Sequence, residues 1–586
     1  MSKPHRKRTD TSQPASPARQ WFWPVLAGLA LLLSVIAWIM VDQSTPMTAV
    51  TTAASPPTPA PVVAPAKLVD EAQCQGCHQA QTDHWKGSHH QLAMQEATEQ
   101  SVLGDFADRQ FKAENETTRF FRRDEQFWVN TVGANGKPKD FRVAYAFGVE
   151  PLQQYLIDTG EGHLQALGVA WDTQKNQWFH LYPGQGVDFK DPLHWSKPQQ
   201  NANFMCVECH TTGFKRNFNA ASGAFESHWN SLGVGCQACH GPASNHLEWA
   251  AKPGNQANAG FSRSTHQGDN ISEVETCARC HARRAPLGDG FHNDRRLMDD
   301  YLPSRLTREL YALDGKIKDE VFEYGAFTQS KMFAKGVRCS NCHDPHSTQL
   351  KAPGDGVCLQ CHNTAGKTAI AGVDGAGLKA KDYTSAEHHH HTPGQPGSQC
   401  VDCHMPGKFY MVNDFRHDHG FSIPAPAQAL KLGTPDACLS CHQSTKGQQV
   451  ADQFRLWYGK DGGSTYASSL DQVRAGKPGA VQALLEQLQG NALPAIRRAT
   501  LLAELANYPS VQTFNAATRD LKHKDAQVRL SALEAVAALL PPEQRQGVLA
   551  PLLRDPVLAV RIAAAYALLP ARAAGLGSDQ AAFDKA

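Results

Sequence analysis

Apolar and polar residues follow three different spacings along the chain, and each spacing predicts a different element. The first is the uncharged run "WFWPVLAGLALLLSVIAWIMV" at 21–41, about the 20 residues that a helix needs to cross a bilayer. Basic residues precede this run and none directly follows it, which predicts a membrane anchor with a cytoplasmic tail at 1–20. The alternative is a cleaved signal peptide, although the apolar run is long for one.

The second spacing is an alternation in "FWVNTVGANGKPKDFRVAYAFGV". Phe127, Val129 and Thr131 occupy alternate positions, and Phe141, Val143 and Tyr145 do so again after Asn135-Gly136. Two alternating runs that flank an Asn-Gly pair are typical of a β-hairpin. The pattern predicts a small β-rich insertion at about 100–200.

The third spacing is helical and repeats near the C-terminus. The strings "PAIRRATLLAEL", "AQVRLSALEAVAAL" and "LAVRIAAAYALL" place Arg497, Arg529 and Arg561 at equal intervals. A fixed period with helical apolar spacing indicates a HEAT-like α-solenoid, here over 445–586. An ordinary helical bundle is the alternative, and a repeat surface of this kind could bind a protein partner.

Composition narrows the functional classes to which the protein can belong. The chain has 586 residues and a formal net charge of +1, so no basic field points to nucleic acid. Residues 42–67 are rich in Pro, Ala and Thr, which predicts an extended linker. Gly and Pro are abundant in the remainder, and such a chain needs staples or large apolar cofactors to complete a core.

Cysteine carries the chemistry. All 16 cysteines fall in Cys-x-x-Cys-His motifs, so none is left over for a disulfide. The motif residues are Cys74, Cys77 and His78; Cys206, Cys209 and His210; Cys236, Cys239 and His240; Cys277, Cys280 and His281; Cys339, Cys342 and His343; Cys358, Cys361 and His362; Cys400, Cys403 and His404; and Cys438, Cys441 and His442.

This spacing suits covalent haem. Two thiols three residues apart can add to the two vinyl groups of one haem, and the following histidine then meets the iron. Zinc ribbons pair Cys-x-x-Cys units without the obligatory histidine, so zinc is disfavoured. The sequence therefore predicts eight covalently bound haem c groups in a domain at 68–444.

Each iron needs a second axial ligand or keeps an open face. From the residues alone, the candidates are His89 or His90, His180, His194, His246, His346, His417 or His419, and one member of the tract His388–His391, with Met94 as an outside candidate. The count fits eight closed haems or seven closed haems and an open one.

Several strings resemble a known family. "YAFGVEPLQQYL", "WFHLYP", "DPLHW", "TCARCHARR", "CSNCHDPHS", the four-histidine run with "CHMP", and "DHGFSIP" are similar to bacterial multihaem c-type cytochromes with doubled CxxCH motifs and a cytochrome c-552/4-like domain. The resemblance implies metal-ligand roles for His89, His180, His194, His246, His346, His391 and His419. Many members carry tetratricopeptide units, from which the repeats here depart.

We therefore expect a mostly α fold with long loops, in which a multihaem domain with a small β-rich insertion precedes the α-solenoid. The expected function is electron transfer along a haem relay in an anaerobic respiratory chain, by a protein anchored in the inner membrane and exposed to the periplasm. Its expected partners are a quinol oxidase module or other cytochromes.

The alternative function is terminal reduction of nitrite, hydroxylamine or sulfite at one open haem. Arg283 and Arg284 could then hold the anion, while His180 and Tyr182 supply protons. The simpler interpretation is that these arginines pair with haem propionates and that His180 is a ligand. The sequence does not decide whether the protein is an enzyme, although it favours an electron carrier over a scaffold that uses haem as filler.

Overall fold

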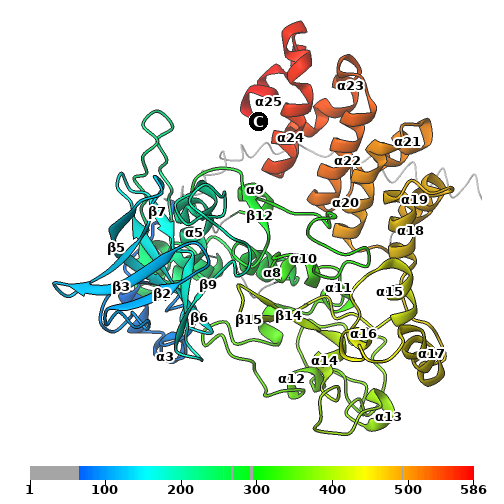
Figure 1. Cartoon of the computed structure of the whole chain (residues 1–586). Helices are drawn as coiled ribbons and strands as arrows, with labels where there is room; N and C mark the ends of the chain where they lie inside the picture. Colours follow the sequence, from blue (N-terminus) through cyan, green and yellow to red (C-terminus); the bar gives the residue numbers. More distant parts are fainter. Residues whose placement is uncertain (1–64, 255–256, 265–267, 291–294, 491) are drawn as a thin grey trace, which may run out of the picture. The chain divides into compact units, whose positions relative to one another are not determined.

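The computed structural model describes residues 65–586 except 255–256, 265–267, 291–294 and 491. The expected cytoplasmic tail and anchor, and nearly all of the expected linker, lie outside these residues. A nine-stranded antiparallel sheet, a region of short helices and long loops, and a C-terminal set of longer helices follow one another along the chain (Figure 1).

The sheet occupies residues 94–180. Its order is β2-β3-β4-β5-β6-β8-β9, with β1 added beside β5 and β7 beside β6. The strands are β1 (Met94–Glu96), β2 (Arg109–Lys112), β3 (Thr117–Arg123), β4 (Gln126–Val132), β5 (Pro138–Phe147), β6 (Leu152–Asp158), β7 (Leu164–Ala166), β8 (Val169–Asp172) and β9 (Gln177–His180). The expected hairpin is confirmed, because β4 pairs with β5 and Val129 lies opposite Phe141.

The prediction of a mostly α fold with a small β-rich insertion was wrong. Burial alternates along β4 and along parts of β3 and β5, as expected of half-buried strands. The strands β7 and β8 are buried at every position and β6 at all but its last, so their sequences, "LQA", "VAWD" and "LQQYLID", show no period of two. The sheet has its own aromatic core, in which Phe120 stacks on Trp178 at 3.5 Å between ring centroids.

Short helices and long loops form the middle of the chain. The helices are α2 (Ala72–Gln75), α3 (Gln79–Trp85), α4 (Ala202–Met205), α5 (Val207–His210), α6 (Cys236–His240), α7 (Ser244–Ala251), α8 (Ile271–Ala278), α9 (Leu297–Asp300), α10 (Tyr324–Phe327), α11 (Lys331–Ala334), α12 (Gly356–Leu359), α13 (Ala386–His389), α14 (Cys400–His404), α15 (Pro426–Leu432) and α16 (Ala437–Cys441). Three two-stranded pairs complete the region, namely β10 (Thr211–Thr212) with β11 (Ser231–Leu232), β12 (Arg284–Pro286) with β13 (Tyr301–Pro303), and β14 (Gly407–Tyr410) with β15 (Asp414–His417).

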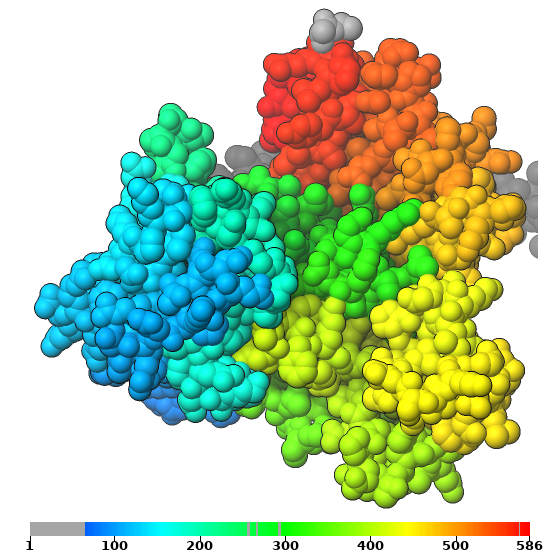
Figure 2. All heavy atoms as spheres, in the orientation of Figure 1, coloured from blue at the N-terminus to red at the C-terminus, as the bar shows by residue number. Residues whose placement is uncertain are grey.

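Longer helices form the C-terminal part, coloured yellow to red in Figures 1 and 2. They are α17 (Gly447–Tyr458), α18 (Thr465–Arg474), α19 (Ala480–Gln489), α20 (Ala495–Glu504), α21 (Val511–Asp520), α22 (Ala526–Leu539), α23 (Gln546–Leu549), α24 (Leu558–Leu568) and α25 (Gln580–Lys585). The three repeated strings form α20, α22 and α24, and α22 packs against both of the others.

Buried ion pairs join consecutive helices of this part. The guanidinium of Arg498 donates to both carboxylate oxygens of Asp520, each at 2.9 Å. The guanidinium of Arg529 forms the same bidentate contact with the carboxylate of Asp555, at 2.7 and 2.8 Å. In α20 the buried arginine is therefore Arg498, one residue after the Arg497 that the sequence period selects.

Gly162 offers a test of backbone packing beside the sheet. Its φ is +74°, and a Cβ built there would lie 1.9 Å from the carbonyl oxygen of Phe225. We expect Gly162→Ala to lower the free energy of unfolding by about 2–4 kcal/mol, because left-handed strain and overlap with backbone add. Denaturant unfolding measures this change. Gly184→Ala is the matched control, since its φ is +75° but the space is open; an equal loss there would assign the cost to φ alone.

Candidate functional site

All 24 residues of the eight motifs line one connected cavity of about 3700 Å³. A pocket for one small ligand has about 300–1,000 Å³, so this cavity suits several large cofactors. Within a motif, one helical turn brings the three side chains together; for example, the N–H of His281 donates to the carbonyl of Cys277 at 2.8 Å. The donor chemistry and the space therefore both fit covalent haem.

Five motif histidines face a second histidine across the cavity. With metal–imidazole bonds of about 2 Å, two rings on opposite sides of one metal ion have centres about 6 Å apart. The pairs are His78 with His246 at 6.1 Å, His281 with His90 at 6.4 Å, His343 with His419 at 6.4 Å, His404 with His388 at 6.3 Å, and His442 with His391 at 6.0 Å. These distances fit iron held between two imidazoles.

Hydrogen bonds at Nδ1 orient many of these rings. The Nδ1–H of His90 donates to the carbonyl of Pro345, that of His246 to Ala259 and that of His391 to His389. His404 and His419 are held in the same way by Ser422 and His417. A carbonyl can only accept, so the proton is on Nδ1 and Nε2 is left for a metal.

Two of the facing histidines are also kept neutral. Burial, followed by the nearby His281, lowers the pKa of His90 to about 4. Burial, followed by the charge of Lys381, lowers the pKa of His388 to about 4. Metal ligation requires a neutral imidazole, and both rings meet this condition at neutral pH.

The expected ligands fall into three groups. His246, His391 and His419 stand opposite motif histidines at the distances above. Among the residues that the structure describes, His89 and His346 line the cavity without such a partner ring, and it is His90, next to His89, that faces His281. His180 and His194 lie away from the large cavity. Ligation by this set remains a prediction.

His180 and His194 line a separate cavity of about 20 Å³ together with Glu116. The Nε2 of His194 lies 3.1 Å from a carboxylate oxygen of Glu116. The Nδ1 of His180 accepts from the backbone N–H of Tyr182 at 3.1 Å, which leaves its proton on Nε2. This tautomer holds a proton on Nε2, and both side chains hydrogen-bond within the region of the sheet; their ligation of iron stays a prediction.

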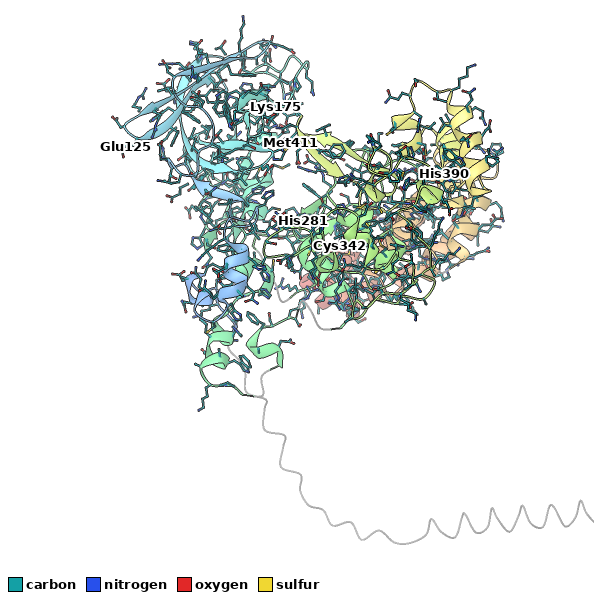
Figure 3. All side chains as sticks on the ribbon, turned by 90° about the horizontal axis from the view of Figure 1, so that it is seen from below. Glu125, Lys175, His281, Cys342, His390 and Met411 are labelled. Carbon is teal, nitrogen blue, oxygen red and sulfur yellow. The ribbon has the colours of Figure 1, made fainter. Side chains whose placement is uncertain are left out.

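The four-histidine tract divides its members between two tasks. His388 and His391 face His404 and His442. His389 is buried and its Nε2 donates to the carbonyl of Thr384. His390, labelled in Figure 3, has a left-handed φ of +57° and stacks on Trp457 at 4.3 Å. The sequence predicts one ligand in the tract, whereas two of its rings face motif histidines; the i,i+3 spacing of His388 and His391 was the available signal.

His210 and His362 differ from the five paired motif histidines. Among the described residues, neither has a second histidine ring in contact. His210 is oriented like a ligand, since its Nδ1–H donates to the carbonyl of Ala93 at 2.8 Å. Its ring meets the edge of Phe147 at 5.4 Å.

The cysteines of different motifs touch one another. Sulfur–sulfur contacts join Cys74 with Cys236, Cys209 with Cys280, Cys277 with Cys339, and Cys358 with Cys400. Cys239 lies near Cys277, Cys342 near Cys358, and Cys403 near Cys438. We number the motifs 1 to 8 in chain order. Neighbouring cysteines then connect them in the series 1-3-4-5-6-7-8, and motif 2 adjoins motif 4 as a side branch.

Arg284 forms an ion pair within the chain, between motifs 2 and 4. Its guanidinium lies 3.1 Å from Glu208 and 3.7 Å above the ring of Tyr301, whose hydroxyl also donates to Glu208 at 2.9 Å. Burial, followed by the charge of Glu208, raises the pKa of Tyr301. Arg284 is thus engaged by a carboxylate of the chain, whereas Arg283 is exposed.

Family matches agree with the motifs. A model of the doubled CXXCH motif matches residues 331–367, and a model described as cytochrome c554 and c-prime matches residues 73–120 and 171–241. With the motif-lined cavity, these matches define a multihaem c-type cytochrome that binds haem c covalently.

Two individual proteins are similar to this chain. The dissimilatory sulfite reductase MccA of Wolinella succinogenes is 22% identical over 425 residues, which cover 64% of this chain and 56% of MccA. The chain thus spans about half the length of that curated relative. The crystal structure of the outer cell wall cytochrome OcwA matches with a TM-score of 0.45 and 17% identity, covering 81% of this chain and all of that one.

Two expectations are corrected. Within the described residues no helix is both long and apolar enough to span a bilayer; the expected inner-membrane location therefore has no support, and its anchor at 21–41 lies outside those residues. The HEAT-like assignment of 445–586 has no support in the family matches reported above, which end at residue 367.

Proposed function

We propose that the protein carries electrons along eight haems, one for each motif. The observation that carries this proposal is the continuous series of neighbouring cysteines from motif 1 to motif 8. Haem edges that adjoin through neighbouring thioether sulfurs are close enough for electrons to hop between them. Axial ligand, burial and hydrogen bonding would then tune each potential.

The two ends of the series suggest where redox partners bind. Cys77 of motif 1 and Cys441 of motif 8 are exposed, while the remaining motif cysteines are partly buried. We infer that electrons enter and leave near these two motifs, exchanged with a quinol-oxidising module or with other cytochromes. The C-terminal helices, which follow motif 8 directly, would offer a surface for such a partner.

Removing the middle of the relay tests the proposal. The fully reduced protein is mixed with a soluble monohaem cytochrome c, an oxidant too bulky to reach buried haems, and the Soret band is followed. We expect one oxidation phase in the parent protein. Cys339→Ser with Cys342→Ser removes the fifth haem and should give two independent phases. A single unchanged phase in that variant would refute the relay.

Reduction of a small anion at motif 2 is the second candidate function. His210 lacks a facing histidine among the described residues, motif 2 is a branch and not a link, and a relative is a sulfite reductase. We expect a high-spin haem in the EPR spectrum and a spectral shift on adding sulfite, nitrite or hydroxylamine. If every haem is low spin and none of these ligands binds, this candidate fails.

A further inference from the structure

One motif histidine is held by a charged side chain. Among the motif histidines, the structure gives His210 and His404 carbonyl partners at Nδ1. The Nδ1 of His281 instead lies 3.0 Å from a carboxylate oxygen of Glu323. His281 is labelled in Figure 3 within the haem-binding region. A metal-bound imidazole donates through Nδ1, so this contact is a charge-assisted hydrogen bond.

The backbone fixes Glu323 against His281. The N–H of Tyr324 donates to the carbonyl of His281 at 3.0 Å, so adjacent residues bind both the main chain and the side chain of the histidine. The carbonyl of Glu323 also accepts from the N–H of Phe327 at 2.8 Å, in the turn of α10. The main chain of Glu323 is therefore held beside His281, within reach of the carboxylate contact at 3.0 Å.

Motif 4, which contains His281, is the junction of the series. Cys280 contacts Cys209 of motif 2, and Cys277 contacts Cys339 of motif 5. Cys239 of motif 3 interacts with Cys277 as well. Any group that sets the potential at motif 4 therefore acts on electron flow into all three neighbouring motifs.

We propose that Glu323 is a positioning residue that lowers the reduction potential of the haem at motif 4, an inference that rests on the proposed relay for its consequence. A carboxylate on Nδ1 makes the imidazole a stronger donor and adds negative charge near the iron. Both effects favour the oxidised state. In the equilibrium concerned, the haem at motif 4 gains one electron from a reductant, and no bond of the chain is made or broken. A lower potential at motif 4 would reduce the share of electrons on its haem relative to the haems of the neighbouring motifs.

Glu323→Gln in the full-length, haem-loaded protein tests the proposal by potentiometric titration followed by EPR. Loss of a hydrogen-bond partner of a metal ligand typically changes metal affinity or activity 10- to 100-fold. We therefore expect the equilibrium constant for reduction of one haem to increase at least about tenfold, which raises its midpoint potential by about 59 mV for one electron. The remaining haems should keep their potentials. Glu323→Asp, which retains the charge at a longer distance, should give a smaller rise at the same haem.

Glu309→Gln is the control for net charge, because Glu309 is exposed and meets no imidazole. The proposal is overturned if all midpoint potentials in Glu323→Gln stay at parent values, or if Glu309→Gln gives the same rise. The titration is made at equilibrium and does not require electrons to travel between motifs. If Glu323→Gln shifts a potential but the parent protein is oxidised in two phases, only the relay is rejected. If Glu323→Gln shifts no potential and the parent protein is oxidised in one phase, only the role of Glu323 is rejected.

Discussion

Replacing His391 with alanine converts one low-spin haem to high spin, and replacing His388 converts a different one. This result follows from the ring distances of 6.0 Å from His391 to His442 and 6.3 Å from His388 to His404. Each substitution removes one of two strong-field imidazoles from one iron. The EPR spectrum of the oxidised protein measures the conversion, and the double variant should show two converted haems.

His390→Ala is the matched control, since this ring stacks on Trp457 and faces no motif histidine. It should leave the number of low-spin haems unchanged while loosening the tract. If His388→Ala and His391→Ala convert the same haem, or if His390→Ala converts one, the assignment of two ligands to this tract is wrong.

Replacing Arg529 with methionine lowers the free energy of unfolding by about 3–5 kcal/mol, because it leaves the carboxylate of Asp555 buried without its partner. Both side chains of the pair are nearly inaccessible, at 10% and 4% exposure. The two-fold contact joins α22 to the segment that precedes α24, so the loss should appear in the unfolding of the C-terminal helices. Denaturant unfolding followed by far-ultraviolet circular dichroism measures the change.

Arg554→Met provides the comparison. Arg554 also meets an aspartate, Asp579, at 2.8 Å, but its side chain is 53% exposed. Exposed pairs contribute about 0–1 kcal/mol, so this variant should unfold close to the parent midpoint. Equal losses in the two variants would contradict the importance of burial.

The chemistry of the chain could be predicted from the sequence because it is encoded locally. A Cys-x-x-Cys-His string needs only one helical turn to bring its donors together, and the structure brings all eight to one cavity. The facing histidines depend on tertiary contacts. His90, His391 and His419 were among the candidates from the sequence, but a second facing ring in the tract, His388, follows only from the ring distances.

The sheet could not be predicted in the same way. Alternation requires one face in water, and β6, buried at all positions but the last, shows no such period. His180 illustrates a related limit: the string "WFHLYP" does not reveal that the N–H of Tyr182, two residues on, donates to the Nδ1 of this histidine. Which ring nitrogen is protonated is decided by the fold and cannot be read from the string.

The buried apolar clusters of the chain differ in size on the two sides of the cavity of about 3700 Å³. The largest lies in the C-terminal helices around Leu502 and Val536, and another lies in the sheet around Phe120 and Trp178. The segment between them holds only small clusters, such as the one around Val274 and Phe327, beside the space for cofactors. We therefore expect the protein to mature from its two ends inward, with the ends collapsing as soon as they are made and the middle remaining open to proteases until the last haem is attached.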